Sequence, residues 1–190
     1  MKVIGICGSH REKSSTLFFL KKAMDAIEKE GIETEIITLW DKDIRPCTVC
    51  DLCKTKYACS QDDDVMGMLE KLVDSDAIIM ASPAYCAMVS GRMKNLMDRS
   101  LPVRRNGMRL SGKVGGAISV GASRNGGQEL VCQQIHTWMG LQEMTTVTDK
   151  DTAHFGGIAW VARGTNPGDD KTGIETCENL GRKICEILKG

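Results

Sequence analysis

Four cysteines stand close together in this chain, at a spacing that suits ligands of iron or zinc. They lie in the stretch PCTVCDLCKTKYAC, at Cys47, Cys50, Cys53 and Cys59. Thiolates spaced this closely are typical of residues that hold a metal ion or an iron–sulfur cluster. Two steps of three residues wrap the backbone around three corners of a four-iron cube, and the five residues before Cys59 form a loop that can reach the fourth. We therefore predict that these cysteines bind a [4Fe–4S] cluster.

A structural zinc ion and a redox-active dithiol are the alternatives for this motif. Zinc sites usually combine two separated C-x2-C knuckles, whereas no second knuckle or histidine follows Cys59. Three cysteines at even steps of three favour a cluster over zinc. The remaining cysteines lie in apolar contexts and are expected to be reduced core residues: Cys7, Cys86, Cys132, Cys177 and Cys185.

Length and composition fit one globular domain that spans residues 1–190. The net charge is zero, and no basic stretch is interleaved with aromatic residues, so nucleic-acid binding is not expected. No apolar run is long enough to span a membrane, and the opening MKVIGICGS is interpreted as a first strand, not as a signal sequence. With reduced cysteines, this indicates a cytoplasmic protein.

The hydrophobic pattern alternates between strands and helices. Strands are predicted at 2–8, 32–39, 77–82, 114–121 and 144–148, and helices at 14–30, 63–74, 90–100, 128–140 and 174–188. The run KVIGICG is apolar throughout, as in a strand that is covered on both faces. Five such units in sequence imply a five-stranded parallel sheet between two layers of helices, an α/β fold. The cysteine-rich segment 41–61 is then an insertion after the second strand.

The loop after the first strand is suited to binding a phosphate group. In an open α/β sheet, ligands bind at the carboxyl ends of the strands, and this loop leads into the free N–H groups of a helix N-terminus. It carries Ser9, Arg11, Ser14, Ser15 and Thr16. A helix N-cap needs only one hydroxyl group, so the number of hydroxyl groups favours a phosphate site over an ordinary cap. No G-x-G-x-x-G dinucleotide motif is present.

Two further loops at strand ends are suited to a planar ligand. Pro83 stiffens the first of them and Tyr85 supplies a flat aromatic ring. In the second, Gly126 and Gly127 allow the backbone to approach a ligand closely, and Arg124 can stabilise negative charge. Each loop alone also fits ordinary turn chemistry, but three such loops at adjacent strand ends favour a ligand site.

The whole chain resembles the iron–sulfur flavoproteins of methanogenic archaea and other anaerobes, which are flavodoxin-like proteins related to NADPH-dependent FMN reductases. The resemblance rests on the cysteine motif together with GSHREKSST, SPAYCAMVSGRMKNLMDRS, SVGASRNGGQE and HFGGIAW. It implies a flavodoxin-like sandwich that binds FMN and one [4Fe–4S] cluster per subunit and moves electrons between them. It also implies a homodimer or tetramer in which the cluster of one subunit faces the flavin of another.

The resemblance implies a role for each loop. The FMN phosphate site is implied at Ser9, Arg11, Ser14, Ser15 and Thr16. Contacts to one side of the isoalloxazine are implied at Pro83, Ala84 and Tyr85, and contacts near its pyrimidine end at Ser123, Arg124, Asn125, Gly126 and Gly127. His10 replaces a common Pro of the family and Ser15 a common Asn, which changes the phosphate loop but not its role. The segment HFGGIAW (154–160) either lines the flavin pocket or closes the sheet edge.

The main functional hypothesis is an FMN-dependent oxidoreductase that transfers electrons. It takes them from a low-potential donor such as ferredoxin, through the cluster to FMN and on to an acceptor. One alternative is an NAD(P)H-dependent FMN or quinone reductase with structural zinc or a redox dithiol at the cysteines. A third is a redox or iron sensor without turnover, for which the chain offers no DNA-binding signature.

Overall fold

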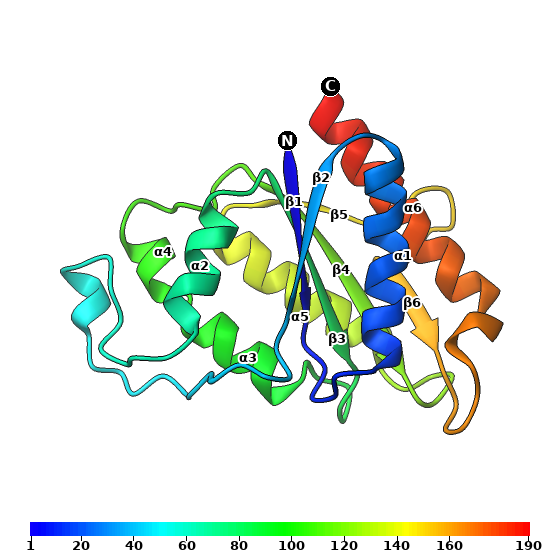
Figure 1. Cartoon of the computed structure of the whole chain (residues 1–190), viewed down its shortest axis with the longest axis horizontal. Coiled ribbons are helices and arrows are strands. Elements are labelled where there is room, and N and C mark those ends of the chain that lie inside the picture. The colour runs from blue at the N-terminus through cyan, green and yellow to red at the C-terminus, as the bar shows by residue number, and fades with distance from the viewer.

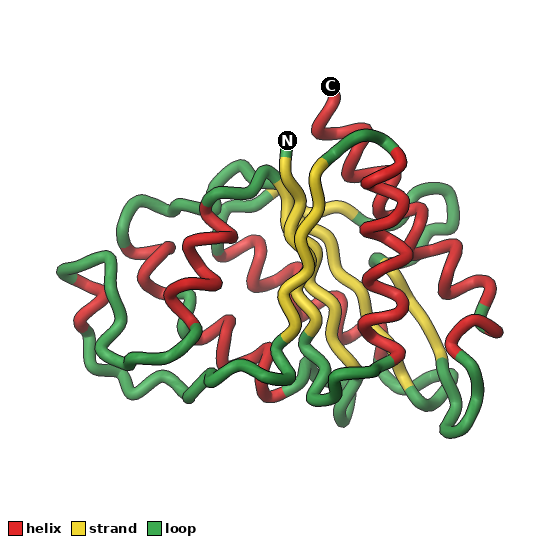
Figure 2. Tube along the Cα trace, in the orientation of Figure 1, coloured by secondary structure: helices red, strands yellow, loops and turns green.

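A parallel sheet of six strands forms the middle layer of the molecule (Figures 1 and 2). The computed structural model describes residues 1–190. The strands are β1 (Lys2–Cys7), β2 (Glu33–Thr38), β3 (Ala77–Pro83), β4 (Val114–Gly121), β5 (Thr145–Val147) and β6 (Gly157–Trp160). The helices are α1 (Ser15–Lys29), α2 (Val65–Val73), α3 (Gly91–Asp98), α4 (Leu101–Arg105), α5 (Gln128–Leu141) and α6 (Lys171–Lys189).

The strand order is β2-β1-β3-β4-β5, and all neighbouring strands run parallel. This is the flavodoxin-like order, which confirms the predicted fold class. The order reverses between β1 and β3, so their carboxyl ends flank the point where such sheets bind ligands.

Alternate residues of each buried strand supply two separate hydrophobic cores. Ile4 and Ile6 of β1 pack with α2, α3, α4 and α5, whereas Val3 and Cys7 face the opposite way. The second core joins the sheet to α1 and α6. Figure 1 shows this division, with α1 and α6 on one face of the sheet and the other four helices on the second face. Both faces are thus covered, as the continuous apolar run of the first strand predicts.

The edge of the sheet differs from the prediction of five strands. β5 pairs only with residues 114–116 of β4, and β6 pairs with residues 118–121 of the same strand. The segment HFGGIAW therefore closes the sheet edge, which is one of the two roles that the sequence analysis gives it. A Cβ atom at Gly156 would lie 2.2 Å from the Ala117 carbonyl oxygen, so only glycine allows this approach. Four residues give too little alternation to predict β6.

The cysteine segment follows β2 and precedes α2. Figure 2 shows it as a long loop that is broken by one short turn of 3₁₀ helix, Leu52–Lys54. Val49 and Asp51 have left-handed backbone conformations, with φ of 54° and 63°. The predicted helix 90–100 corresponds to α3, and the short helix α4, which was not predicted, follows it and contacts the 3₁₀ turn of this loop.

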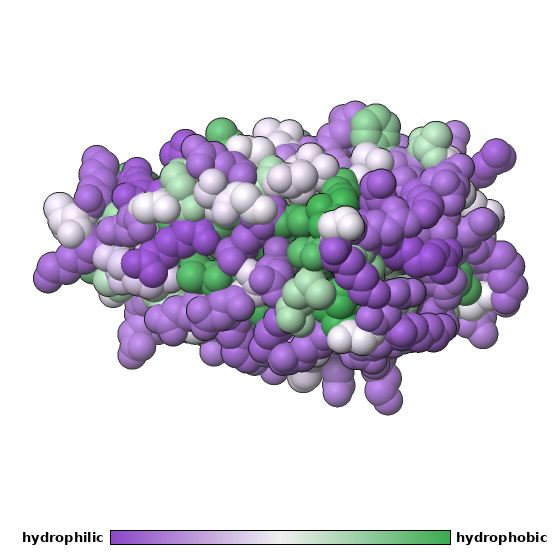
Figure 3. Space-filling view, turned by 90° about the horizontal axis from the view of Figure 1, so that it is seen from above, coloured by the Kyte–Doolittle hydropathy of each residue, from purple (hydrophilic) through white to green (hydrophobic).

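The surface seen from above is largely hydrophilic, and hydrophobic residues gather in a strip over the middle of the molecule (Figure 3). None of the helices combines the length and the apolar character that crossing a membrane requires.

Candidate flavin and cluster sites

Three loops meet at the carboxyl edge of the sheet, after β1, β3 and β4. The ring of His10 in the first loop lies edge-on to Tyr85 in the second, with ring centroids 5.6 Å apart. Ser90 donates a hydrogen bond of 2.6 Å to the Gly8 carbonyl oxygen, which ties the same two loops together. Gly127 of the third loop packs so closely on Ala87 that a Cβ atom there would lie 2.3 Å from the Ala87 Cβ. The structure thus brings the three predicted loops into contact.

The first loop forms the N-terminus of α1. Ser14 is the N-cap, and its hydroxyl accepts a hydrogen bond of 3.2 Å from the Leu17 N–H. The hydroxyl of the buried Ser9 accepts one of 3.1 Å from the Arg11 N–H. Two of the predicted hydroxyls therefore shape the loop itself. The first turn of α1 has no acidic residue, so its positive end is free to attract an anion.

The loop after β4 is held by Gln128, a residue that the sequence analysis did not single out. Its side-chain oxygen accepts a hydrogen bond of 2.8 Å from the Gly126 N–H, and its amide nitrogen donates one of 2.9 Å to the Ser123 carbonyl. Gln128 is 1% exposed. Gly127 has a left-handed φ of 84°. The loop is therefore preformed, with the exposed Arg124 at its tip.

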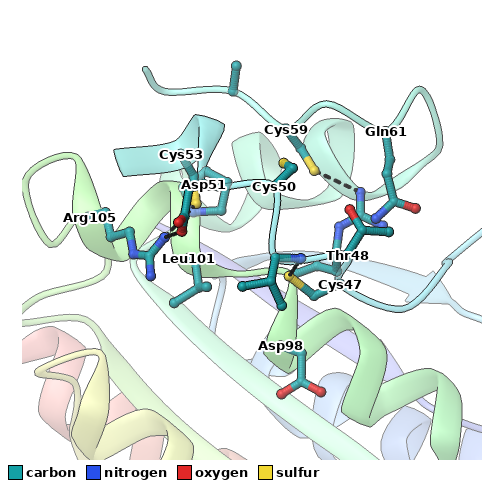
Figure 4. Close-up of a pocket in the computed structure, with 14 residues that line it drawn as sticks. Cys47, Thr48, Cys50, Asp51, Cys53, Cys59, Gln61, Asp98, Leu101 and Arg105 are labelled. Carbon is teal, nitrogen blue, oxygen red and sulfur yellow. Dashed lines mark hydrogen bonds and ion pairs between the residues drawn. The ribbon is translucent and has the colours of Figure 1, made fainter. Parts of the chain in front are cut away.

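The four motif cysteines line one cavity of about 70 Å³, together with Val49, Leu101 and Pro102 (Figure 4). Each sulfur atom accepts one hydrogen bond from a different donor. The donors are the Val49 N–H to Cys47 at 3.4 Å, the Ser60 hydroxyl to Cys50 at 2.9 Å, Arg105 to Cys53 at 3.0 Å and Arg99 to Cys59 at 3.2 Å. All nine cysteines of the chain are free thiols, and the five outside the motif are buried as predicted except Cys86, which is exposed and is not a core residue.

The chemistry of this donor set fits an iron–sulfur cluster. The four ligands offered are all thiols, which is the ligand set of [4Fe–4S] clusters, and hydrogen bonds to the sulfurs tune such clusters. The Ser60 hydroxyl, as the main cause, holds the pKa of the Cys50 thiol below its usual value, which favours the thiolate that binds iron. No group of three or more His, Cys, Asp or Glu side chains lies close enough together to hold a single metal ion. The sulfurs instead line the cavity from several sides.

A buried ion pair between Arg99 and Asp63 lies against the cysteine segment. Arg99 donates hydrogen bonds of 2.7 and 2.9 Å to the two carboxylate oxygens of Asp63, and both side chains are almost fully buried. Burial opposes ionisation of Asp63, but the hydrogen bonds and charge of Arg99 outweigh it and lower the pKa of Asp63. Arg99 also binds the Arg45 carbonyl oxygen at 2.9 Å. One side chain thus connects both ends of the segment to the α3–α4 corner.

The two sites lie in different parts of the molecule. Figure 1 shows the cysteine segment beyond α2 and α4, at the end of the molecule opposite α6, whereas the three loops lie at the lower ends of the strands. The fold and the carboxyl-edge loops define a flavodoxin-like protein.

Comparison with known proteins agrees with this class. A family model described as NADPH-dependent FMN reductase matches residues 1–154. An iron–sulfur flavoprotein of Methanocaldococcus jannaschii is 49% identical, with 100% of this chain and 98% of the relative covered. One of Methanosarcina thermophila is 37% identical, over 100% of this chain and 96% of the relative. The crystal structure of RosB with a bound 8-demethyl-8-formylriboflavin-5'-phosphate intermediate has a TM-score of 0.74 at 20% identity, covering 100% of this chain and 80% of RosB.

The chain belongs to the NADPH-dependent FMN reductase family and, within it, to the iron–sulfur flavoproteins. It is an FMN-dependent oxidoreductase. The predicted family is therefore confirmed.

Proposed function

We propose that this protein transfers electrons from a low-potential donor such as ferredoxin, through a [4Fe–4S] cluster held by Cys47, Cys50, Cys53 and Cys59, to FMN and on to an acceptor. The observation that carries the proposal is the cavity lined by all four thiols, each of which already accepts a hydrogen bond. The names of the relatives support the pairing of iron–sulfur and flavin chemistry. The cofactors carry out the redox chemistry, while the protein positions them and adjusts their reduction potentials.

The three carboxyl-edge loops are proposed to hold FMN. When bound, FMN supplies both one-electron and two-electron redox chemistry. Ser9, Arg11, Ser14, Ser15 and Thr16 would hold its phosphate at the positive end of α1. Pro83, Ala84 and Tyr85 would flank the ring system. Ser123, Arg124, Asn125, Gly126 and Gly127 would lie at its pyrimidine end, where a guanidinium and backbone N–H groups stabilise negative charge.

The separation of the two sites favours assembly as a homodimer or tetramer. Within one chain, α3 lies between the 3₁₀ turn of the cysteine segment and the three loops (Figure 1). A second copy that brings its loops to the exposed segment would place flavin and cluster side by side. Sedimentation of the cofactor-loaded protein tests this arrangement, and a mass of one chain contradicts it.

The cofactor content of protein purified without oxygen tests the proposed function directly. We expect about four iron atoms, four acid-labile sulfides and one FMN per chain. Iron, sulfide, zinc and flavin are measured on the same sample. FMN with zinc, or FMN without any metal, would contradict the cluster. Absence of flavin would contradict the assignment of all three loops.

The family model favours a second candidate function, an NAD(P)H-dependent FMN or quinone reductase with zinc or a redox dithiol at the cysteines. Rapid bleaching of the flavin by NADPH, in protein that contains no iron, would support it. Slow bleaching by NADPH, with rapid reduction by ferredoxin, would support the electron-transfer function.

Substitution of Gly127 by alanine is expected to weaken FMN binding by at least tenfold, or about 1.4 kcal/mol. The new methyl group would clash with Ala87, and the left-handed φ of 84° disfavours any residue with a Cβ atom. The loops after β3 and β4 would separate. The dissociation constant is measured by fluorescence titration of flavin-free protein. Gly67→Ala is the matched control, because no atom lies within 4 Å of its added Cβ. Equal affinities of the two variants would disprove the role of this contact.

A further inference from the structure

Two distant segments form a basic surface beside Cys53. Asn106, which follows α4, donates hydrogen bonds of 3.1 and 3.3 Å to the carbonyl oxygens of Cys53 and Lys56. The Arg109 guanidinium lies 3.9 Å from the centroid of the Tyr57 ring. These contacts hold residues 53–57 against residues 105–109.

We call this surface the basic patch, and define it as Lys54, Lys56, Arg105 and Arg109. All four residues are exposed at the surface. Asp51 is the acidic residue that pairs with the patch, at 2.9 Å from Lys54 and 3.6 Å from Arg105. Four cations against one carboxylate leave a positive surface on a chain whose overall net charge is zero. Burial raises the pKa of the Tyr57 hydroxyl, and Glu70 of α2 and Asp74, which follows α2, are close enough to raise it further and border the patch.

The basic patch is continuous with the cysteines. Arg105 belongs to the patch and also donates a hydrogen bond to the Cys53 sulfur. Figure 4 shows Arg105, Asp51 and Cys53 together on one side of the cavity, whereas Cys59 and Gln61 lie on the other. Cys50 is exposed. The neighbouring Val49 is 77% exposed, more than any other large hydrophobic residue of the chain.

An exposed apolar residue beside a rim of cations suits a short-lived complex with an acidic protein. Weak redox complexes bury little surface. Their association rates depend mainly on complementary charge, which steers the encounter. A positive patch next to the thiols would attract a negative carrier to the point where electrons enter.

We propose that the basic patch and Val49 are the docking surface for an acidic one-electron carrier protein, which delivers its electron beside Cys50 and Cys53. This proposal rests on the proposed function and adds the place and the charge of the donor. In each encounter the carrier loses one electron and the protein's iron–sulfur site gains one, with no bond made or broken and no proton required. The second copy of the proposed assembly would then meet the other side of the cavity, at Cys59 and Gln61 (Figure 4). The competing occupant of the basic patch is a second copy seated on the patch itself.

The variant Lys54→Glu/Lys56→Glu tests the docking surface without changing any residue that contacts a sulfur atom. The holoprotein is mixed with a reduced, negatively charged ferredoxin in a stopped-flow instrument, and the second-order rate constant is measured from about 50 to 300 mM salt. We expect the rate constant at low salt to fall by about tenfold or more, and its dependence on salt to weaken.

A matched control variant is available on the far face of the sheet. Lys21→Glu/Lys183→Glu makes the same change in net charge on α1 and α6. Lys54 has an ion pair with Asp51 three residues away and Lys56 has none. In the same way Lys183 has an ion pair with Glu186 three residues away and Lys21 has none. We expect this control to keep the wild-type rate constant within about twofold.

The outcomes separate this proposal from the proposed function. Equal rate constants for the two double variants would overturn the docking surface while leaving the function intact. The extent of reduction by excess dithionite, which needs no docking, is expected to be unchanged in both variants, and a loss confined to Lys54→Glu/Lys56→Glu would overturn docking as the cause of its slower reduction. A change in sedimenting mass of that variant would overturn the proposal in favour of a contact between subunits. Wild-type protein without iron would overturn the proposed function itself.

Discussion

Replacing Cys50 with serine is expected to remove most of the iron and sulfide while FMN remains bound. Cys50 is exposed, and the Ser60 hydroxyl donates to its sulfur at 2.9 Å and lowers the pKa of its thiol. Serine has neither the soft sulfur atom nor the low pKa that iron ligation requires. The loops proposed to hold FMN lie in another part of the molecule (Figure 1). Iron should fall from about four atoms per chain to less than one, as measured on protein purified without oxygen.

The control for this experiment is Cys86→Ser, which also replaces an exposed thiol but outside the motif. It is expected to keep its full iron and sulfide. If Cys50→Ser retains four iron atoms, the ligand assignment is wrong. If it loses FMN together with iron, the two sites are not independent.

The fold could be predicted from the sequence where hydrophobic runs are long. β1, β3 and β4 are buried on both faces, and their apolar residues mark the strands directly. The edge could not be predicted in the same way. The sequence predicts β5, but β6, which pairs with the same strand β4, has only four residues, too few to show a period.

The thiols of the candidate cluster site could be predicted, but their hydrogen-bond donors could not. The cysteine spacing is local and lies within thirteen residues, so it is visible in the sequence. Arg99 and Arg105 contact sulfurs that lie 40 and 52 residues earlier in the chain. In the sequence they are ordinary charged residues near a helix end. Only the turn between α3 and the unpredicted α4 brings both arginines to the cysteine segment.

Arg99 links this site to the stability of the fold. It is one of the largest fully buried side chains in the protein. Its two hydrogen bonds to Asp63 compensate a carboxylate that has no exposed surface. Removal of one partner of such a pair usually costs more than the pair itself contributes, because the remaining charge stays buried without compensation.

Arg99→Met is therefore expected to lower the free energy of unfolding by about 3–5 kcal/mol. For a protein of this size, that is a fall of about 6–20 °C in the midpoint of thermal unfolding, measured by circular dichroism on the holoprotein. Arg99→Met/Asp63→Leu, which removes both charges, should recover more than half of the loss. If the double variant is no more stable than Arg99→Met, the unpaired carboxylate is not the cause. The cost would then lie in the other contacts of Arg99, to the Arg45 carbonyl and the Cys59 sulfur.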